Sequence, residues 1–313
     1  KLPVGWVGFV VLWHPEIVRM RAKTLIKRIY MTALPEAGVL YVVATPIGHL
    51  GDLTRRAEKV LKSVQIVAAE DTRRTRGLLD HIDHHVPELV SLHEHNEQQM
   101  LPKLVSRLQA GADIAIVSDA GTPLVNDPGY LLVGAAHAAG IQIVPVPGAC
   151  SITTSLSVCP LPCQPFLYVG FLPAKSSNRQ RALQSYFAQS HALVFLEAPH
   201  RILACLADIA LHCDRRVMIG RELTKQYETI LVGTPEEVIQ ALGEQPKGEF
   251  TCVIEAVAGV EQNHDHVKVL TALLSELPAA KAAKVAASIC GVRKSEMYDL
   301  ALTLAAKSSD GSR

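Results

Sequence analysis

The residues best suited to binding or catalysis are the two carboxylates of Ser118–Gly129, whose sequence is SDAGTPLVNDPG. Asp119 and Asp127 are accompanied by two glycines, which let a ligand approach the backbone, and by two prolines, which hold a loop in shape. The apolar run that precedes them, residues 112–117, predicts a buried parallel strand. Open α/β sheets bind ligands at the carboxyl ends of their strands, so the stretch is either a binding loop or only a well-capped connection to a helix.

Three further strand ends in the first half of the chain carry polar groups. These strands are followed by the segments Thr45–Thr54 (TPIGHLGDLT), Glu70–Thr75 (EDTRRT) and His93–Glu97 (HEHNE). Two glycines three residues apart in the first of these loops could hold a nucleotide, but neither a dinucleotide-binding fingerprint nor a P-loop is present. Because four such ends belong to one predicted sheet, we expect them to converge on one crevice.

Arg, Glu and Lys also gather at strand ends in the second half, in residues 197–201 (EAPHR), 221–225 (RELTK) and 247–249 (KGE). This composition suits an anionic ligand or proton transfer, with surface ion pairs as the alternative. No nucleophile elbow is present and no cysteine has the setting of a nucleophile, so we expect chemistry without a covalent intermediate. The histidines show no ligand spacing backed by a third group, and we therefore expect no metal.

Alternating short apolar runs and amphipathic segments predict two α/β domains. In the first, strands are expected at 39–44, 65–69, 88–92, 112–118 and 141–146, with helices at 54–63, 72–80, 97–110 and 128–139. In the second, strands are expected at 166–171, 192–197, 216–221, 228–232 and 250–257, with helices at 178–188, 201–212 and 235–242. The pair 216–221 and 228–232 could be antiparallel, and a short helix at 151–157 falls at the hinge.

Three short helices at 265–277, 279–288 and 294–306 predict a small helical appendage. The expected organisation is an extension at 1–37, an α/β domain at 38–158, a second at 159–260, and the appendage with its tail at 261–313. Residues 1–30 differ in character from the rest, and we interpret them as translated sequence upstream of the start or as a non-native extension, with a membrane-surface segment as the alternative.

Charge and cysteine content narrow the class of protein. Six of the 31 Lys and Arg residues, but only one of the 30 Asp and Glu residues, lie in residues 1–30, so the remaining chain is slightly acidic. Any contact with RNA must therefore come from local basic patches. Seven cysteines without a CxxC pair argue against a secreted disulfide framework and favour buried thiols in a reducing cytoplasm.

Eight motifs in this order resemble the ribosomal RNA branch of the tetrapyrrole methylase superfamily: TPIGHLGDLT, AAEDTRRT, HEHNE, SDAGTPLVNDPG, PGACS, EAPHR, RELTK and KGEF. The resemblance covers about Val39 to Val257. It implies two α/β domains of the tetrapyrrole methylase type with a cofactor cleft between them, an appended helical segment and a homodimer. It further implies 2′-O-ribose methylation, dependent on S-adenosyl-L-methionine, of a cytidine in the decoding region of 16S rRNA.

The resemblance also implies site residues, motif by motif. The residues that would bind the cofactor are Pro46, Asp119, Gly121, Thr122, Pro123 and Ser151 from the first domain and Ala198, Pro199 and Gly248 from the second. A hydroxyl that attacks a sulfonium methyl group is helped by a nearby base or cation, for which Lys225 and Glu222 are the candidates. An ion pair with Glu222 or Glu228 is the structural alternative for Lys225, while Arg73 and Arg201 are candidates to bind RNA phosphates.

Two other functions stay open at this point. A porphyrin- or corrin-type small-molecule methyltransferase would share the fold, although the GxGPGD pattern is absent and the appended helices are present. A non-catalytic RNA-binding module of ribosome assembly would keep the fold without the chemistry, although the acidic and glycine positions of Ser118–Gly129 are intact. With ordinary basic patches, we expect the rRNA substrate to be the folded small subunit and not free RNA.

Overall fold

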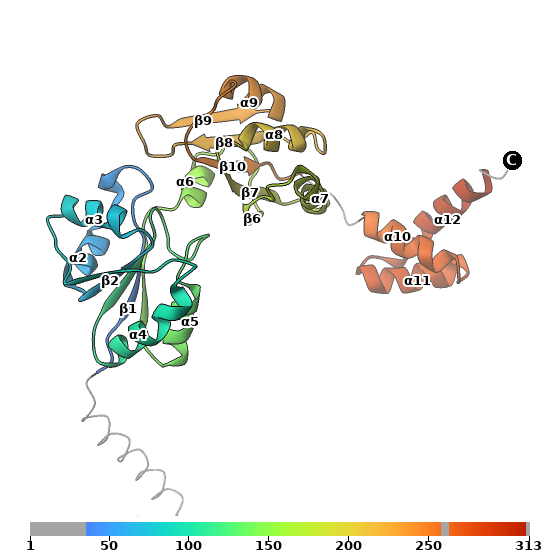
Figure 1. Ribbon diagram of the computed structural model, residues 1–313. Coiled ribbons are helices and arrows are strands. Elements are labelled where there is room, and N and C mark those ends of the chain that lie inside the picture. Colours follow the sequence, from blue (N-terminus) through green and yellow to red (C-terminus); the bar gives the residue numbers. More distant parts are fainter. Residues whose placement is uncertain (1–35, 258–262, 311–313) are drawn as a thin grey trace, which may run out of the picture. The chain divides into compact units, whose positions relative to one another are not determined.

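The structure, a computed structural model, describes residues 36–257 and 263–310 (Figure 1). Contacts group these residues into two units. The first contains residues 36–154 and the segment Leu223–Tyr227, and the second contains Ser155–Glu222 and the described residues from Glu228 onward. The return of Leu223–Tyr227 to the first unit is a feature that a linear division of the sequence does not contain. The interpretation of residues 1–30 lies outside the described part of the chain.

The first unit is built on a five-stranded parallel sheet of order β3-β2-β4-β1-β5. Its strands are β1 (Leu40–Val43), β2 (Ile66–Ala69), β3 (Glu88–Ser91), β4 (Ile114–Val117) and β5 (Ile143–Val146). The central strand β4 and its neighbour β2 are buried along their whole length, as expected for apolar runs covered by helices on both faces.

Helices cover both faces of this sheet (Figure 1). On one face lie α2 (Arg55–Ser63) and α3 (Thr72–His81), and on the other lie α4 (Glu97–Gln109) and α5 (Tyr130–Ala138). A short 3-10 helix, η1 (Leu50–Asp52), precedes α2, and α6 (Ser151–Ser157) follows β5. Thr54 is the N-cap of α2, because its hydroxyl accepts the Ala57 N–H at 3.0 Å.

The second unit has a mixed five-stranded sheet of order β6-β7-β10-β8-β9. Its elements are β6 (Phe166–Phe171), α7 (Ser176–Phe187), β7 (Ala192–Glu197), α8 (Ile202–Ala210), β8 (Val217–Arg221), β9 (Thr229–Gly233), α9 (Pro235–Leu242) and β10 (Phe250–Ile254). Strands β6 and β7 are parallel, and β10 is antiparallel to both β7 and β8. The predicted antiparallel pairing of β8 with β9 is confirmed, and with it the two α/β sheets predicted from the sequence.

The three predicted C-terminal helices are present as α10 (Asn263–Leu274), α11 (Ala279–Cys290) and α12 (Lys294–Asp310). They share a small core centred on Leu270, four alanines of α11, Met297 and Ala301. Gly291 ends α11 in the left-handed conformation at φ 69°, which glycine adopts without steric cost.

Candidate functional site

The loops that follow β1 and β4 are joined to each other at the carboxyl edge of the first sheet. The Thr45 N–H donates to the Gly121 carbonyl at 2.9 Å, and the Gly121 N–H donates back to Thr45 at 3.1 Å. The Thr45 hydroxyl also donates to the Ser118 carbonyl at 3.2 Å. Gly121 has a φ of +88°, so a side chain there would be strained, and its Cβ would lie 3.3 Å from Ile47. Both loops are therefore held in one defined conformation.

Asp119 connects the β4 loop to the end of β2. One of its carboxylate oxygens accepts the Asp71 N–H at 2.9 Å, while its own N–H donates to the Glu70 carboxylate at 3.2 Å. The other oxygen lies 3.5 Å from an Arg74 nitrogen, and 23% of the side chain is exposed. Glu70 and Asp71 thus contact Asp119 at this edge, where the motif predicted polar groups but no role for either residue.

Asp127, the second carboxylate of the loop, lies in a different environment. Burial raises the pKa of Asp127 to about 6, and the negative charges of Glu70 and Asp119 add to that effect. A hydrogen bond with Ser118 acts in the opposite direction. Three carboxyl groups thus influence one edge of the sheet, an arrangement that suits a ligand with hydroxyl or cationic groups.

The loop after β5 belongs to the same edge. The Thr122 hydroxyl donates to the Ala149 carbonyl at 3.2 Å. Gly148 passes so close to β1 that an added Cβ would lie 2.9 Å from the Ala44 Cβ. The remaining first-unit cofactor candidates lie in these loops or at their ends: Pro46 and Pro123 are buried, and Ser151 begins α6.

The segment Leu223–Tyr227 brings Lys225 to the loop after β1. The His49 N–H donates to the Thr224 hydroxyl at 3.1 Å. Gly48 leaves room for this approach, since a Cβ on Gly48 would lie 2.5 Å from the Lys225 Cγ and 2.7 Å from the Thr224 hydroxyl. Thr224 itself has a φ of 64°, an uncommon conformation for a β-branched residue. Lys225 is therefore a member of the first unit's edge.

Glu222, the other acid–base candidate, packs within the second unit. Its carboxylate accepts the Glu249 N–H at 2.9 Å, and its own N–H donates to the Glu249 carbonyl at 2.9 Å. Gly248 has a φ of +100°, and a Cβ there would lie 2.4 Å from the Glu222 Cγ. Only glycine fits this contact, so the structure brings Glu222 and Gly248 together.

The two arginines predicted to bind RNA have different surroundings. Arg201 is engaged internally: its Nε lies 3.0 Å from a Glu197 oxygen, and Nη2 donates to the Leu172 carbonyl. Arg73 is on the surface with 90% of its side chain exposed, and its Nη2 lies 2.8 Å from the Asp71 carboxylate. The predicted phosphate contact of each remains a prediction, and Arg73 has the more accessible guanidinium.

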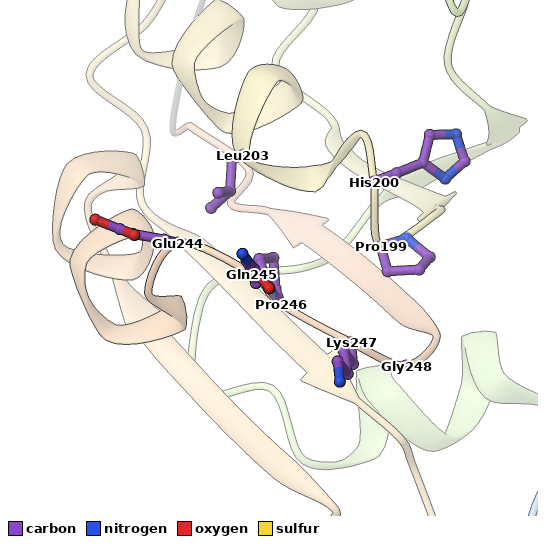
Figure 2. Close-up of a pocket in the computed structure, with 8 residues that line it drawn as sticks. All are labelled: Pro199, His200, Leu203, Glu244, Gln245, Pro246, Lys247 and Gly248. Atoms are coloured by element: carbon purple, nitrogen blue, oxygen red, sulfur yellow. The ribbon is translucent and has the colours of Figure 1, made fainter.

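A pocket of about 430 Å³ lies in the second unit (Figure 2). Residues after β7 line it on one side and residues before β10 on the other: Pro199, His200, Leu203, Glu244, Gln245, Pro246, Lys247 and Gly248. The Lys247 carbonyl is held by the Arg221 Nε at 2.7 Å. Pro199 and Gly248 were assigned from motifs, and Ala198 directly precedes Pro199, whereas Glu244–Pro246 carried no pattern that would have identified them. A pocket of this size accommodates a nucleoside-sized ligand.

Two negative observations concern residues 36–257 and 263–310 only. No group of three or more His, Cys, Asp and Glu side chains is arranged there to hold a metal ion. No helix in those ranges combines the length and the apolar character needed to cross a bilayer.

Two family models match the chain. The model of the tetrapyrrole (corrin/porphyrin) methylases matches residues 39–239, and the model of the RsmI C-terminal HTH domain matches residues 260–305. The chain is 46% identical to the ribosomal RNA small subunit methyltransferase I of Escherichia coli O157:H7 over 85% of this chain and 95% of that protein. It is 44% identical to the protein of the same name from Pseudomonas aeruginosa, over 87% and 99%.

Solved structures share the fold at low identity. A uroporphyrin III C-methyl transferase from Thermus thermophilus superposes with a TM-score of 0.51 at 19% identity, covering 69% of this chain and 97% of that one. A diphthine synthase superposes with a TM-score of 0.54 at 14% identity, covering 70% and 90%.

Proposed function

The chain belongs to the family of ribosomal RNA small subunit methyltransferase I, and from this membership we propose that it methylates the ribose 2′-hydroxyl of a cytidine in the decoding region of 16S rRNA. The methyl donor in this proposal is S-adenosyl-L-methionine, and the substrate is the folded small subunit. The observation that carries the proposal is the 46% identity to the Escherichia coli protein over 95% of its length. A homodimer and a cytoplasmic location are part of the same proposal.

The residues present fit a nucleoside-bearing cofactor. A solved structure of the Thermus thermophilus uroporphyrin-III C-methyl transferase contains S-adenyl homocysteine. It superposes on this chain with a TM-score of 0.50 at 19% identity. In this chain the pocket beside Pro199 and Gly248 has a nucleoside's size. The carboxylates at the first sheet's edge can accept hydrogen bonds from hydroxyl or ammonium groups.

The cofactor would supply an electrophilic methyl group on a sulfonium, and the protein's own residues have to align the acceptor with it. Correct orientation alone can contribute roughly 7–11 kcal/mol. We assign binding to Pro46, Asp119, Gly121, Thr122, Pro123 and Ser151 of the first unit and to Ala198, Pro199 and Gly248 of the second. The Thr45–Gly121 and Thr122–Ala149 hydrogen bonds keep these loops in place, so little reorganisation is needed at the moment of transfer.

Proton removal from the 2′-hydroxyl is assigned to Lys225, with Glu222 as the alternative. A positioned base or cation contributes typically about 10²–10⁴-fold. The Lys225 Cγ lies close to Gly48, which holds this part of the lysine side chain against the loop after β1. Arg73 is assigned to a backbone phosphate, and Arg201 is retained as a weaker candidate because Glu197 already engages its guanidinium.

The test is transfer of a labelled methyl group from S-adenosyl-L-methionine to small subunits isolated from a strain that lacks the enzyme, followed by mapping of 2′-O-methyl groups on the rRNA. We expect one labelled cytidine in the decoding region and little label on a short free oligonucleotide of the same sequence. Calorimetry with the cofactor alone separates an enzyme from a non-catalytic module. Label on an added porphyrin and none on rRNA would contradict the proposal.

A further inference from the structure

Two neighbouring helices of the first unit carry a concentrated positive charge. Helices α2 and α3 together contain seven Lys and Arg residues and two acidic residues, whereas the whole chain has 31 Lys and Arg against 30 Asp and Glu. The seven cations, which we call the α2–α3 basic surface, are Arg55, Arg56, Lys59, Lys62, Arg73, Arg74 and Arg76. All seven are exposed, so the charge faces solvent.

The two helices carry these cations over one face of the first unit's sheet. Both pack on the same face of the sheet, α2 through Ala57 and Leu61 and α3 through Leu78 and Leu79, and both begin at the carboxyl edge of the strands (Figure 1). Their positively polarised N-termini therefore point to the edge that holds Asp119. Arg74, which lies 3.5 Å from the Asp119 carboxylate, connects the surface to that edge.

Much of this charge has no internal partner. Lys62 pairs with Glu58 at 2.7 Å, and Arg73 pairs with Asp71 at 2.8 Å. Among the described residues, no ion pair involves Arg55, Arg56, Lys59 or Arg76. Like charges on one surface repel one another, and a bound polyanion removes that cost.

The surface lacks the apolar anchors that other partners require. None of the large exposed hydrophobic residues of the described chain belongs to α2 or α3. Protein interfaces depend on buried aromatic or aliphatic side chains, and membrane-surface helices insert an apolar face. Guanidinium groups match phosphate oxygens in geometry, so a row of arginines without apolar neighbours suits a nucleic-acid backbone.

We propose that the α2–α3 basic surface binds the sugar–phosphate backbone of the rRNA substrate and so delivers the target nucleotide to the carboxyl edge of the first sheet. The inference rests on the proposed function and extends it from one arginine to a surface. Backbone contacts of this kind position a nucleic acid without reading its sequence.

The test is the triple variant Arg55→Gln/Arg56→Gln/Arg76→Gln, which removes three unpaired and exposed cations. It leaves the ion pairs of Arg73 and Arg74 with the carboxylates of the site intact. Small-subunit binding is measured directly, without cofactor, over a series of salt concentrations. We expect about 10- to 100-fold weaker binding at 0.1 M salt and a salt slope reduced by roughly 2 to 3, since each phosphate contact contributes about 0.7–0.9. In the methylation assay the loss should appear in KM, with cofactor affinity unchanged.

A matched control removes the same charge from the second unit in Lys175→Gln/Arg181→Gln/Arg216→Gln, three exposed residues outside the site. Unchanged binding and salt slope in the α2–α3 variant would overturn the inference, and so would an equal loss in the control, because bulk charge would then explain the effect. If the wild-type chain binds small subunits but transfers no methyl group, the proposed function is wrong. The binding measurement still shows whether the α2–α3 basic surface contacts RNA.

Discussion

At the scale of single residues, the two carboxylates of Ser118–Gly129 have different surroundings. Asp119 accepts the Asp71 N–H and lies beside Arg74. Asp127 is held where burial and neighbouring negative charges favour the protonated form. The chemical type of both residues was visible in the sequence, but their surroundings were not. They depend on burial and on Glu70, which the pairing of β2 with β4 brings close.

The first prediction concerns the pH dependence of stability at Asp127. Its folded pKa of about 6 lies above the ordinary aspartate pKa of 3.8, so the folded state binds the proton more tightly than the unfolded state. The ionised carboxyl destabilises the fold fully above pH 6, and this cost disappears as the pH falls toward 3.8. Urea unfolding of wild type and Asp127→Asn should show the variant gaining at pH 7.5 and losing that advantage by about pH 4. A pH-independent difference would contradict the assignment.

The second prediction concerns Lys225. Replacement by Ala should lower the rate of methyl transfer by about 10²–10⁴-fold and leave the Kd for S-adenosyl-L-methionine unchanged, because the proposed task is to assist the attacking hydroxyl. Lys225→Arg is the matched control: it keeps the cation but cannot accept a proton at neutral pH, so recovery of activity would indicate an electrostatic role. Undiminished single-turnover rates in Lys225→Ala would remove the residue from the mechanism.

At the scale of elements, α7 and α8 are joined by a buried ion pair. Arg179 Nη2 lies 2.6 Å from an Asp208 oxygen, and both side chains are almost fully buried. Although burial acts to raise the pKa of Asp208, hydrogen bonds from Gln180, Ser176 and Arg179 hold it below its usual value. Each of these two buried charges therefore has the other as its partner.

The third prediction is the cost of breaking this pair. Asp208→Ala leaves the Arg179 guanidinium buried without its counter-charge, and the free energy of unfolding should fall by about 3–5 kcal/mol in urea denaturation. The double variant Arg179→Met/Asp208→Leu buries no charge and should recover most of that loss. If both variants were equally destabilised, packing and not charge would account for the effect.

The elements were largely predictable because buried apolar runs and helix caps are local signals. The sequence of β4 is apolar along its whole length, and Thr54 is of a residue type that commonly caps helices at their N-termini. The place of β10 between β7 and β8 was not predicted, because a strand buried on both faces has the same composition in either direction. The return of Leu223–Tyr227 to the first unit depends on Gly48, which has no side chain to obstruct Thr224 and Lys225. The sequence alone does not show that these residues approach Gly48.

At the scale of the whole molecule, the C-terminal helices have a core of their own. The cluster around Leu270, Ala286 and Met297 contains only residues of α10, α11, α12 and their connections. The two α/β sheets are built around other clusters. Independent cores of this kind allow one part to be removed without exposing the apolar interior of another.

The last prediction follows from that separation and from the charge of the helices. Lys281, Lys284, Arg293 and Lys294 are all exposed on α11, α12 and their connection. A chain truncated after Val257 should therefore keep the affinity for S-adenosyl-L-methionine and the main thermal transition of the sheets. Its affinity for small subunits should fall by about tenfold or more. Calorimetry and salt-dependent binding check the two halves of the prediction. Loss of the main transition would contradict the independence of the cores, and full affinity of the truncated chain would assign substrate binding to the α/β units alone.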